Sequence, residues 1–153
     1  KFKIFNWRDR GSDERQYCAP GIDLPIASVM RTKYGCYPEY HTSLDRFDTV
    51  VTKKGLEGGL DFTKKIIDAL ENNFYINYKI LCEPNLGKRG LYPKISKKNN
   101  YNDEIKNIRD ILSWADGKTT LIDIAEMINV PIWDLYNIVK NLSKKKLISL
   151  KRK

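Results

Sequence analysis

The chain has 153 residues, of which 41% are hydrophobic and 31% are charged, with nine Gly and six Pro. This composition suits one ordinary domain or two small ones, and it excludes a disordered or fibrous chain. The formal net charge of +9 is spread along the sequence apart from a basic C-terminal stretch, so it indicates a surface that attracts anions without establishing a nucleic-acid partner.

The start of the sequence and its cysteines bear on where the protein works. The sequence begins at Lys1 without Met, signal peptide or membrane span, so we expect more polypeptide upstream and a cytoplasmic protein. The three cysteines, Cys18, Cys36 and Cys82, are odd in number and lack the close spacing of a metal knuckle. A bridge between Cys18 and Cys36 stays open, although the lack of a secretory signal favours reduced thiols.

The first fifty residues read as two short strands separated by irregular segments. Residues 1–5, "KFKIF", alternate as a strand does. Residues 24–31, "LPIASVMR", have the apolar run of a buried strand, although a run this short is ambiguous. Residues 6–25 are polar and punctuated by Gly and Pro, which predicts a loop with or without a short helix. Residues 32–50 form a second irregular segment.

The middle of the chain predicts one helix and one strand. Residues 52–73 place Leu60, Ile66, Ile67 and Leu70 at helical spacing before two asparagines that suit a stop. Residues 74–84, "FYINYKILCEP", are rich in β-branched and aromatic side chains, which predicts a strand. Residues 85–100 read as a connector, and we expect a domain boundary after residue 98.

The C-terminal residues 99–153 predict a small winged-helix domain of three helices and a closing strand. A first helix over residues 102–116 presents four apolar side chains on one face and stops at Gly117, and Thr120 and Asp123 open a second helix as a capping box does. Pro131 suits the first turn of a third helix. The apolar positions are Ile105, Ile108, Ile111 and Leu112 in the first helix and Leu135, Ile138, Val139 and Leu142 in the third.

The third helix is poorly equipped to read DNA. Its residues 131–139, "PIWDLYNIV", contain one acid, one Asn and no basic side chain. The lysines collect at residues 144–146, where they suit backbone phosphates or simply terminate the helix favourably. We therefore expect Trp133 and Tyr136 to pack against the larger domain or a protein partner, and we do not expect sequence-specific DNA binding.

The only histidine of the chain, His41, lies in the segment "EYHTSLDRFD" at residues 39–48. A zinc site takes three or four ligands, and the sequence offers no second His, no "HxxxH" and no "CxxC". Taken alone, His41 reads either as a packed structural side chain or as one ligand of a site whose other ligands come from elsewhere.

Four motifs in order resemble the C-terminal part of a known family. They are "RGSDERQYCAPGIDLP" at residues 10–25, "YPEYHTSLDRFD" at 37–48, "CEPNLGKRGLYP" at 82–93 and "DGKTTLIDIAEMINVP" at 116–131. Together they resemble the co-catalytic zinc aminopeptidase fold, in a bacterial branch that has a winged-helix C-terminus and is often encoded among polysaccharide-biosynthesis genes. The resemblance extends over almost the whole chain. It implies an α/β architecture in which residues 1–98 are the C-terminal portion of a mixed-sheet peptidase domain.

The resemblance also implies residue roles. His41 would ligate one zinc of a pair, and Asp45 would hold the loop or a ring nitrogen, unless it is a simple turn acid or helix cap. Tyr40 would donate to the oxyanion of a tetrahedral intermediate, unless it is only a half-buried aromatic. Ser12 and Asp13 would brace the first loop.

The resemblance suggests that Arg15 and Gln16 bind a carboxylate or amide of the substrate. The alternative for Arg15 is a surface ion pair with Asp13 or Glu14. The family's other ligands (a His-x-Asp pair and a bridging Asp) and its Glu-Glu pair with the general base precede Lys1 in the family order. We therefore expect this chain alone neither to bind two zinc ions tightly nor to hydrolyse peptides. A DNA- or protein-binding module on a non-catalytic scaffold, and an amide hydrolase for a polysaccharide precursor, are the alternative functions.

Overall fold

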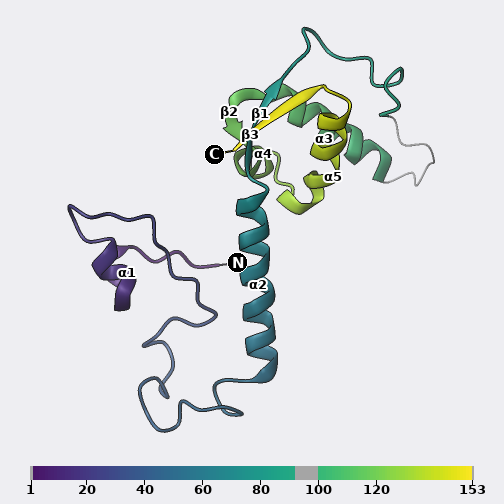
Figure 1. Ribbon diagram of the computed structural model, residues 1–153. Coiled ribbons are helices and arrows are strands. Elements are labelled where there is room, and N and C mark those ends of the chain that lie inside the picture. The colour runs from purple at the N-terminus through teal and green to yellow at the C-terminus, as the bar shows by residue number, and fades with distance from the viewer. Residues whose placement is uncertain (1, 92–99, 153) are drawn as a thin grey trace. The chain divides into compact units, whose positions relative to one another are not determined.

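The computed structural model describes residues 2–91 and 100–152, with their element order shown in Figure 1. The chain divides into two compact units, Lys1–Gly59 and Leu60–Lys153. Helix α2, Lys53–Glu71, begins in the first unit and continues into the second. Among the described residues, no helix is both long and apolar enough to cross a membrane.

The first unit is built mainly from turns and contains two short helical segments. The 3-10 helix η1 spans Trp7–Asp9 and helix α1 spans Ser12–Tyr17. The strands expected at residues 1–5 and 24–31 are wrong for the described residues, because no neighbouring segment pairs with either one. A strand is stable only where a partner takes its backbone N–H and C=O groups.

The second unit contains a three-stranded antiparallel sheet in the order β2-β1-β3. Its strands are β1 (Phe74–Tyr78), β2 (Asp116–Thr120) and β3 (Ile148–Arg152). The register between β1 and β2 shifts near Asn77, and the facing Gly117 has a φ of +78°. Glycine adopts this left-handed conformation at little cost, which suits the irregular pairing.

Three helices cover this sheet and supply most of the core (Figure 1). They are α3 (Asn100–Ser113), α4 (Leu121–Met127) and α5 (Ile132–Lys144). The predicted apolar face of α5 is confirmed, and the Thr120–Asp123 capping box forms as expected. The buried residues of α5 are Ile132, Leu135, Ile138, Val139 and Leu142.

The expected domain boundary after residue 98 does not match the packing. Strand β1 precedes that boundary in sequence, yet it is the central strand of the winged-helix sheet and pairs on both edges. Its Ile76 is fully buried in the same core as the helices. The composition of residues 74–84 predicted a strand, but composition does not specify the sheet to which a strand belongs. Of the expected connector, residues 92–99 lie outside the described residues.

Candidate functional site

The two motif-bearing loops of the first unit are joined by Tyr34. The backbone N–H of Gly11 donates a hydrogen bond to the Tyr34 hydroxyl, which itself donates to Glu14 Oε1 at 3.2 Å. A Cβ atom at Gly11 would lie 3.2 Å from the Tyr34 ring, so glycine permits the close approach of the two loops. The loop that carries Arg15 and Gln16 is thereby held against the loop that carries Tyr40 and His41.

Glu14 is the buried carboxylate of this junction, with only 5% of its surface exposed. A hydrogen bond from its own backbone N–H lowers the pKa of Glu14 and outweighs the opposite effect of burial. The hydroxyls of Ser28 and Tyr34 and the charge of Arg10 lower this pKa further. The carboxylate is therefore ionised at neutral pH and can accept several hydrogen bonds at once.

His41 lies in a cluster of aromatic rings. Its imidazole stacks on the ring of Tyr40, with ring centroids 4.0 Å apart and an interplanar angle of 18°. Tyr40 in turn contacts Tyr34 and Tyr37 at centroid distances of 6.0 and 5.7 Å. The side chain of His41 is exposed and its backbone has a φ of +61°, which is uncommon for a residue other than glycine. The ring is thus fixed on one face and open to additional contacts on the other.

Asp45 is bonded to Tyr37. The Tyr37 hydroxyl donates to Asp45 Oδ2 at 3.2 Å, and desolvation followed by the charge of Asp45 raises the pKa of Tyr37. Asp45 is expected to hold either the loop or a ring nitrogen of His41. In the structure it contacts Tyr37 of the same loop. Tyr40 is half-buried.

Arg15 lies beside Trp7 in the first loop. Its guanidinium carbon is 4.9 Å from the centre of the Trp7 ring, and its Nη1 donates to the carbonyl of Arg10 at 3.2 Å. Ion pairs of Arg15 with Asp13 or Glu14 are absent from the part of the chain that the structure describes. Gln16 and Asp13 are exposed on α1. Stacking on Trp7 orders the Arg15 side chain and leaves most of its guanidinium N–H groups available to a carboxylate.

Potential metal ligands do not gather into a cluster in the part of the chain that the structure describes. Over residues 2–91 and 100–152, no group of three or more His, Cys, Asp or Glu side chains is close enough to hold a metal ion. His41 is one exposed donor. A zinc ion needs four protein ligands, or three and a position left open for water.

Sequence patterns alone missed Glu14, Tyr34 and Tyr37. Glu14 and Tyr34 are separated by 20 residues, so no short motif joins them. The only available signal was the three-residue spacing of Tyr34, Tyr37 and Tyr40, which places three aromatic rings beside the histidine.

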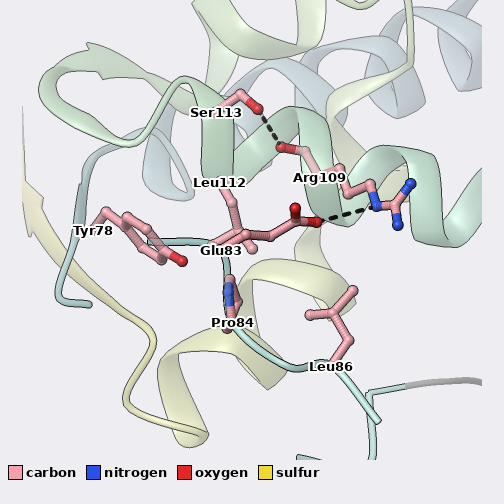
Figure 2. A pocket seen from close by; sticks show the side chains of 7 residues that line it. All are labelled: Tyr78, Glu83, Pro84, Leu86, Arg109, Leu112 and Ser113. Carbon is pink, nitrogen blue, oxygen red and sulfur yellow. Dashed lines mark hydrogen bonds and ion pairs between the residues drawn. The ribbon is translucent and has the colours of Figure 1, made fainter. Parts of the chain in front are cut away.

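The second unit has a pocket of about 430 Å³ between α3 and the segment that follows β1 (Figure 2). Arg109 and Glu83 form an ion pair at 3.5 Å, and the hydroxyl of Ser113 donates to the carbonyl of Arg109 (Figure 2). The Tyr78 hydroxyl donates to the carbonyl of Cys82. These contacts hold the segment against α3. Among the described residues that line this pocket, no nucleophile is paired with a base.

The face of α5 that carries Trp133 and Tyr136 is partly covered by α2. The ammonium group of Lys65 lies 5.3 Å from the centre of the Trp133 ring. Desolvation, with a smaller effect of Asp68, raises the pKa of Tyr136 to about 12. Trp133 and Tyr136 therefore have α2 as a neighbour in this chain.

The sheet, the capped helix α4 and the amphipathic helix α5 define a winged-helix protein, preceded by a loop-rich unit that carries a histidine-tyrosine cluster. Residues 73–150 match the family described as winged helix-turn-helix, and the chain belongs to this family. Residues 1–73 match a family described as a domain of unknown function (DUF4910).

Two relatives from Clostridium acetobutylicum are similar to the chain. One, named as a candidate polysaccharide biosynthesis protein with an aminopeptidase-like domain, is 42% identical over 123 residues, which are 80% of this chain and 27% of that protein. A crystal structure of a candidate peptidase matches with 34% identity and a TM-score of 0.78, over 93% of this chain and 30% of that one. The resemblance and the mixed α/β fold with a winged helix are thereby confirmed, and the chain spans less than a third of either relative's length.

Proposed function

We propose that the first unit contributes part of the active site of an aminopeptidase-like hydrolase, which is completed by polypeptide outside this sequence. The supporting observation is the junction through Tyr34, which holds the Arg15 loop and the His41 loop together. A site formed by loops on a common support is typical of enzymes, since substrate groups and reacting groups must be held at fixed separations.

The proposed roles follow from the exposed chemistry of each side chain. His41 offers one imidazole to a metal ion, with its ring orientation fixed by stacking on Tyr40. The hydroxyl of Tyr40 is a donor for developing negative charge on a substrate oxygen. Arg15 and Gln16 are suited to a substrate carboxylate or amide. Zinc is part of this proposal only as an ion that His41 helps to hold once other ligands are present.

The need for additional polypeptide is supported by the poor burial of the first unit. Every buried hydrophobic residue found among the described residues lies between Ile76 and Ile148, in the second unit. Fourteen large hydrophobic side chains of the first unit are exposed, Phe2 and Ile4 at 86% and 84%. A unit without an apolar core does not offset its conformational entropy, so these side chains require a covering partner.

The substrate is proposed as a peptide or an amide. One relative is named for polysaccharide biosynthesis, which supports an amide-bearing sugar precursor as the alternative to a peptide. A screen of amino-acid anilides against acylated amino sugars separates the two.

The test uses a hybrid in which this chain replaces the matching segment of the Clostridium acetobutylicum relative. We expect the hybrid to bind zinc and the His41→Ala hybrid to lose about one zinc ion per chain, measured by mass spectrometry of the metal. His41→Cys should retain more zinc than His41→Ala, since a thiolate also ligates zinc, and Thr42→Ala is the matched control. Equal zinc content in the His41→Ala and unaltered hybrids contradicts the proposed role.

We also propose a cytoplasmic location. All three cysteines are free, and Cys36 and Cys82 are exposed. Exposed thiols persist in a reducing compartment and oxidise outside one.

A further inference from the structure

Helix α2 carries apolar side chains on two opposite sides. On one side, Ala69 packs against the core of the second unit and Lys65 lies over Trp133. The large apolar side chains of the other side are exposed, and they are Leu60 at 55%, Ile67 at 55% and Leu70 at 62%. At about 100° of rotation per residue, Leu60 and Ile67 lie about 160–180° around the helix axis from Ala69. One side of α2 is therefore covered by this chain, whereas the opposite side is apolar and exposed.

The exposed apolar residues form a continuous row along the helix axis. We call this row the α2 stripe, and its members are Leu56, Leu60, Ile67 and Leu70. Successive members are four, seven and three residues apart, which keeps them on one side of a helix over about four turns. Single apolar residues on a surface are ordinary, but an aligned row marks a contact surface. A helix that is apolar on opposite sides is typical of the interior of a larger protein.

The charges along one border of the α2 stripe are balanced. Lys53, Glu57, Lys64 and Glu71 follow that border with alternating sign. Lys53 pairs with Glu57 at 3.9 Å, and Glu71 pairs with Arg152 at 3.6 Å. A balanced border gives little attraction for the phosphates of a nucleic acid or for an anionic membrane surface. The α2 stripe therefore suits an apolar protein surface.

The extent of the relatives indicates where that protein surface comes from. This chain spans 27% of one relative and 30% of the other, so more than two thirds of each protein lies outside the match. The family match to residues 1–73 contains the whole of α2. In addition, Leu56 is both an exposed hydrophobic residue of the first unit and the first member of the α2 stripe. The polypeptide that covers the first unit is therefore the natural occupant of the stripe.

We propose that the α2 stripe is buried against an apolar surface of the polypeptide that completes the hydrolase. The inference rests on the proposed function for its occupant, and it adds the residues of the second unit that meet this occupant. Helix α2 is then an interior helix that supports α5 on one side and the hydrolase on the other. The winged-helix unit is thus attached directly to the enzyme through α2, and is not a separate module on a flexible linker.

The first test compares the reactivity of one thiol in this chain alone and in the hybrid with the Clostridium acetobutylicum relative. Ile67→Cys should react with a maleimide at least about tenfold more slowly in the hybrid than in the chain alone, because the contact shields the thiol. Mass spectrometry of the labelled peptide separates this thiol from the three native cysteines. Asp61→Cys, at an exposed position of α2 outside the stripe, should react alike in both proteins. Equal rates for Ile67→Cys in the two proteins overturn the proposal.

The second test measures the energetic effect of the same contact. Leu60→Ser/Ile67→Ser should lower the melting temperature of the hybrid by at least about 5 °C, because buried apolar side chains are lost. In the chain alone the same change should shift the melting temperature by less than about 2 °C, because the side chains are exposed there. Lys54→Ser/Asp61→Ser is the matched control, at exposed polar positions of α2, and should shift neither protein.

Two outcomes of the second test overturn the proposal. One is a hybrid whose melting temperature does not respond to the stripe variant. The other is a dimeric hybrid that the stripe variant converts to a monomer in sedimentation velocity, since a second copy is then the occupant.

The zinc measurement on the hybrid keeps this inference distinct from the proposed function. If the thiol at position 67 is shielded while zinc content does not depend on His41, the proposed function is wrong and the contact stands. If zinc content depends on His41 while the thiol at position 67 stays fully reactive, the contact is wrong and the proposed function stands.

Discussion

Replacing Tyr136 with Phe should stabilise the winged-helix unit, and the gain should grow at high pH. At neutral pH the substitution removes a buried hydroxyl that has no hydrogen-bond partner within the described residues. Relieving such a group is worth about 1 kcal/mol, the lower end of the cost of an unsatisfied buried polar atom, because Asp68 offsets part of that cost.

The pH dependence has a definite sign. The pKa of Tyr136 is about 12 in the folded chain, above the ordinary tyrosine value of about 10. A raised folded pKa contributes stability that is fully present below pH 10 and is lost as pH rises toward 12, because the unfolded phenol ionises first. At pH 11 the wild-type chain has lost about 1.4 kcal/mol from this residue, and the Phe variant has no such group to ionise.

The assay is urea denaturation at pH 8 and pH 11, followed by far-ultraviolet circular dichroism on both proteins. The variant should be about 1 kcal/mol more stable at pH 8, and its advantage should increase by about a further 1.4 kcal/mol at pH 11. Tyr17→Phe, at an exposed position of the other unit, controls for the loss of one phenol. An advantage that does not change with pH, or a variant less stable than wild type at pH 8, refutes this account of Tyr136.

Other expectations follow from single contacts. Leu135→Ala, at a fully buried position of α5, should lower the free energy of unfolding by about 2–5 kcal/mol in the same denaturation assay. Thr120→Ala removes the capping box of α4 and should cost about 1 kcal/mol. Tyr34→Phe should leave the unfolding of the second unit unchanged but increase amide exchange of residues 11–18, because the bridging hydroxyl is lost. Calorimetric titration of the chain with zinc should show no tight binding, and robust turnover of peptide anilides would contradict the single-ligand interpretation of His41.

The winged-helix part of the fold was largely predictable from the sequence because its information is local. The apolar spacing of α5 and the Thr120–Asp123 cap are read within one or two helical turns. Strand β2 was missed because "DGKTT" has no apolar alternation and pairs through its backbone beside Gly117. The extended pairing of a strand depends on a partner that may be remote in sequence, which is also why residues 24–31 were assigned wrongly.

The candidate site was predictable only as separate motifs. The order of the motifs drew attention to His41, Tyr40 and Arg15, but it gave no account of how their loops meet. That contact depends on Tyr34 and the buried Glu14, which are 20 residues apart, and on the glycine that lets a tyrosine ring approach the backbone. Contacts of this kind become visible only when the chain is folded, because no short sequence spacing joins Tyr34 to Glu14.

Helix α2 is where the sequence families and the packing divide the chain differently. The two family matches meet at residue 73, whereas the compact units meet between Gly59 and Leu60. The second half of α2 is counted with the first family, yet its Ala69 packs against the core of the second unit and its Lys65 covers Trp133. A winged-helix fragment that begins at residue 73 would lose these contacts and expose the face of α5 that carries Trp133. A fragment that begins at residue 60 would keep them. The segment that limits access to α5 is therefore an integral part of the winged-helix unit, and a DNA-binding role would require this helix to leave its place.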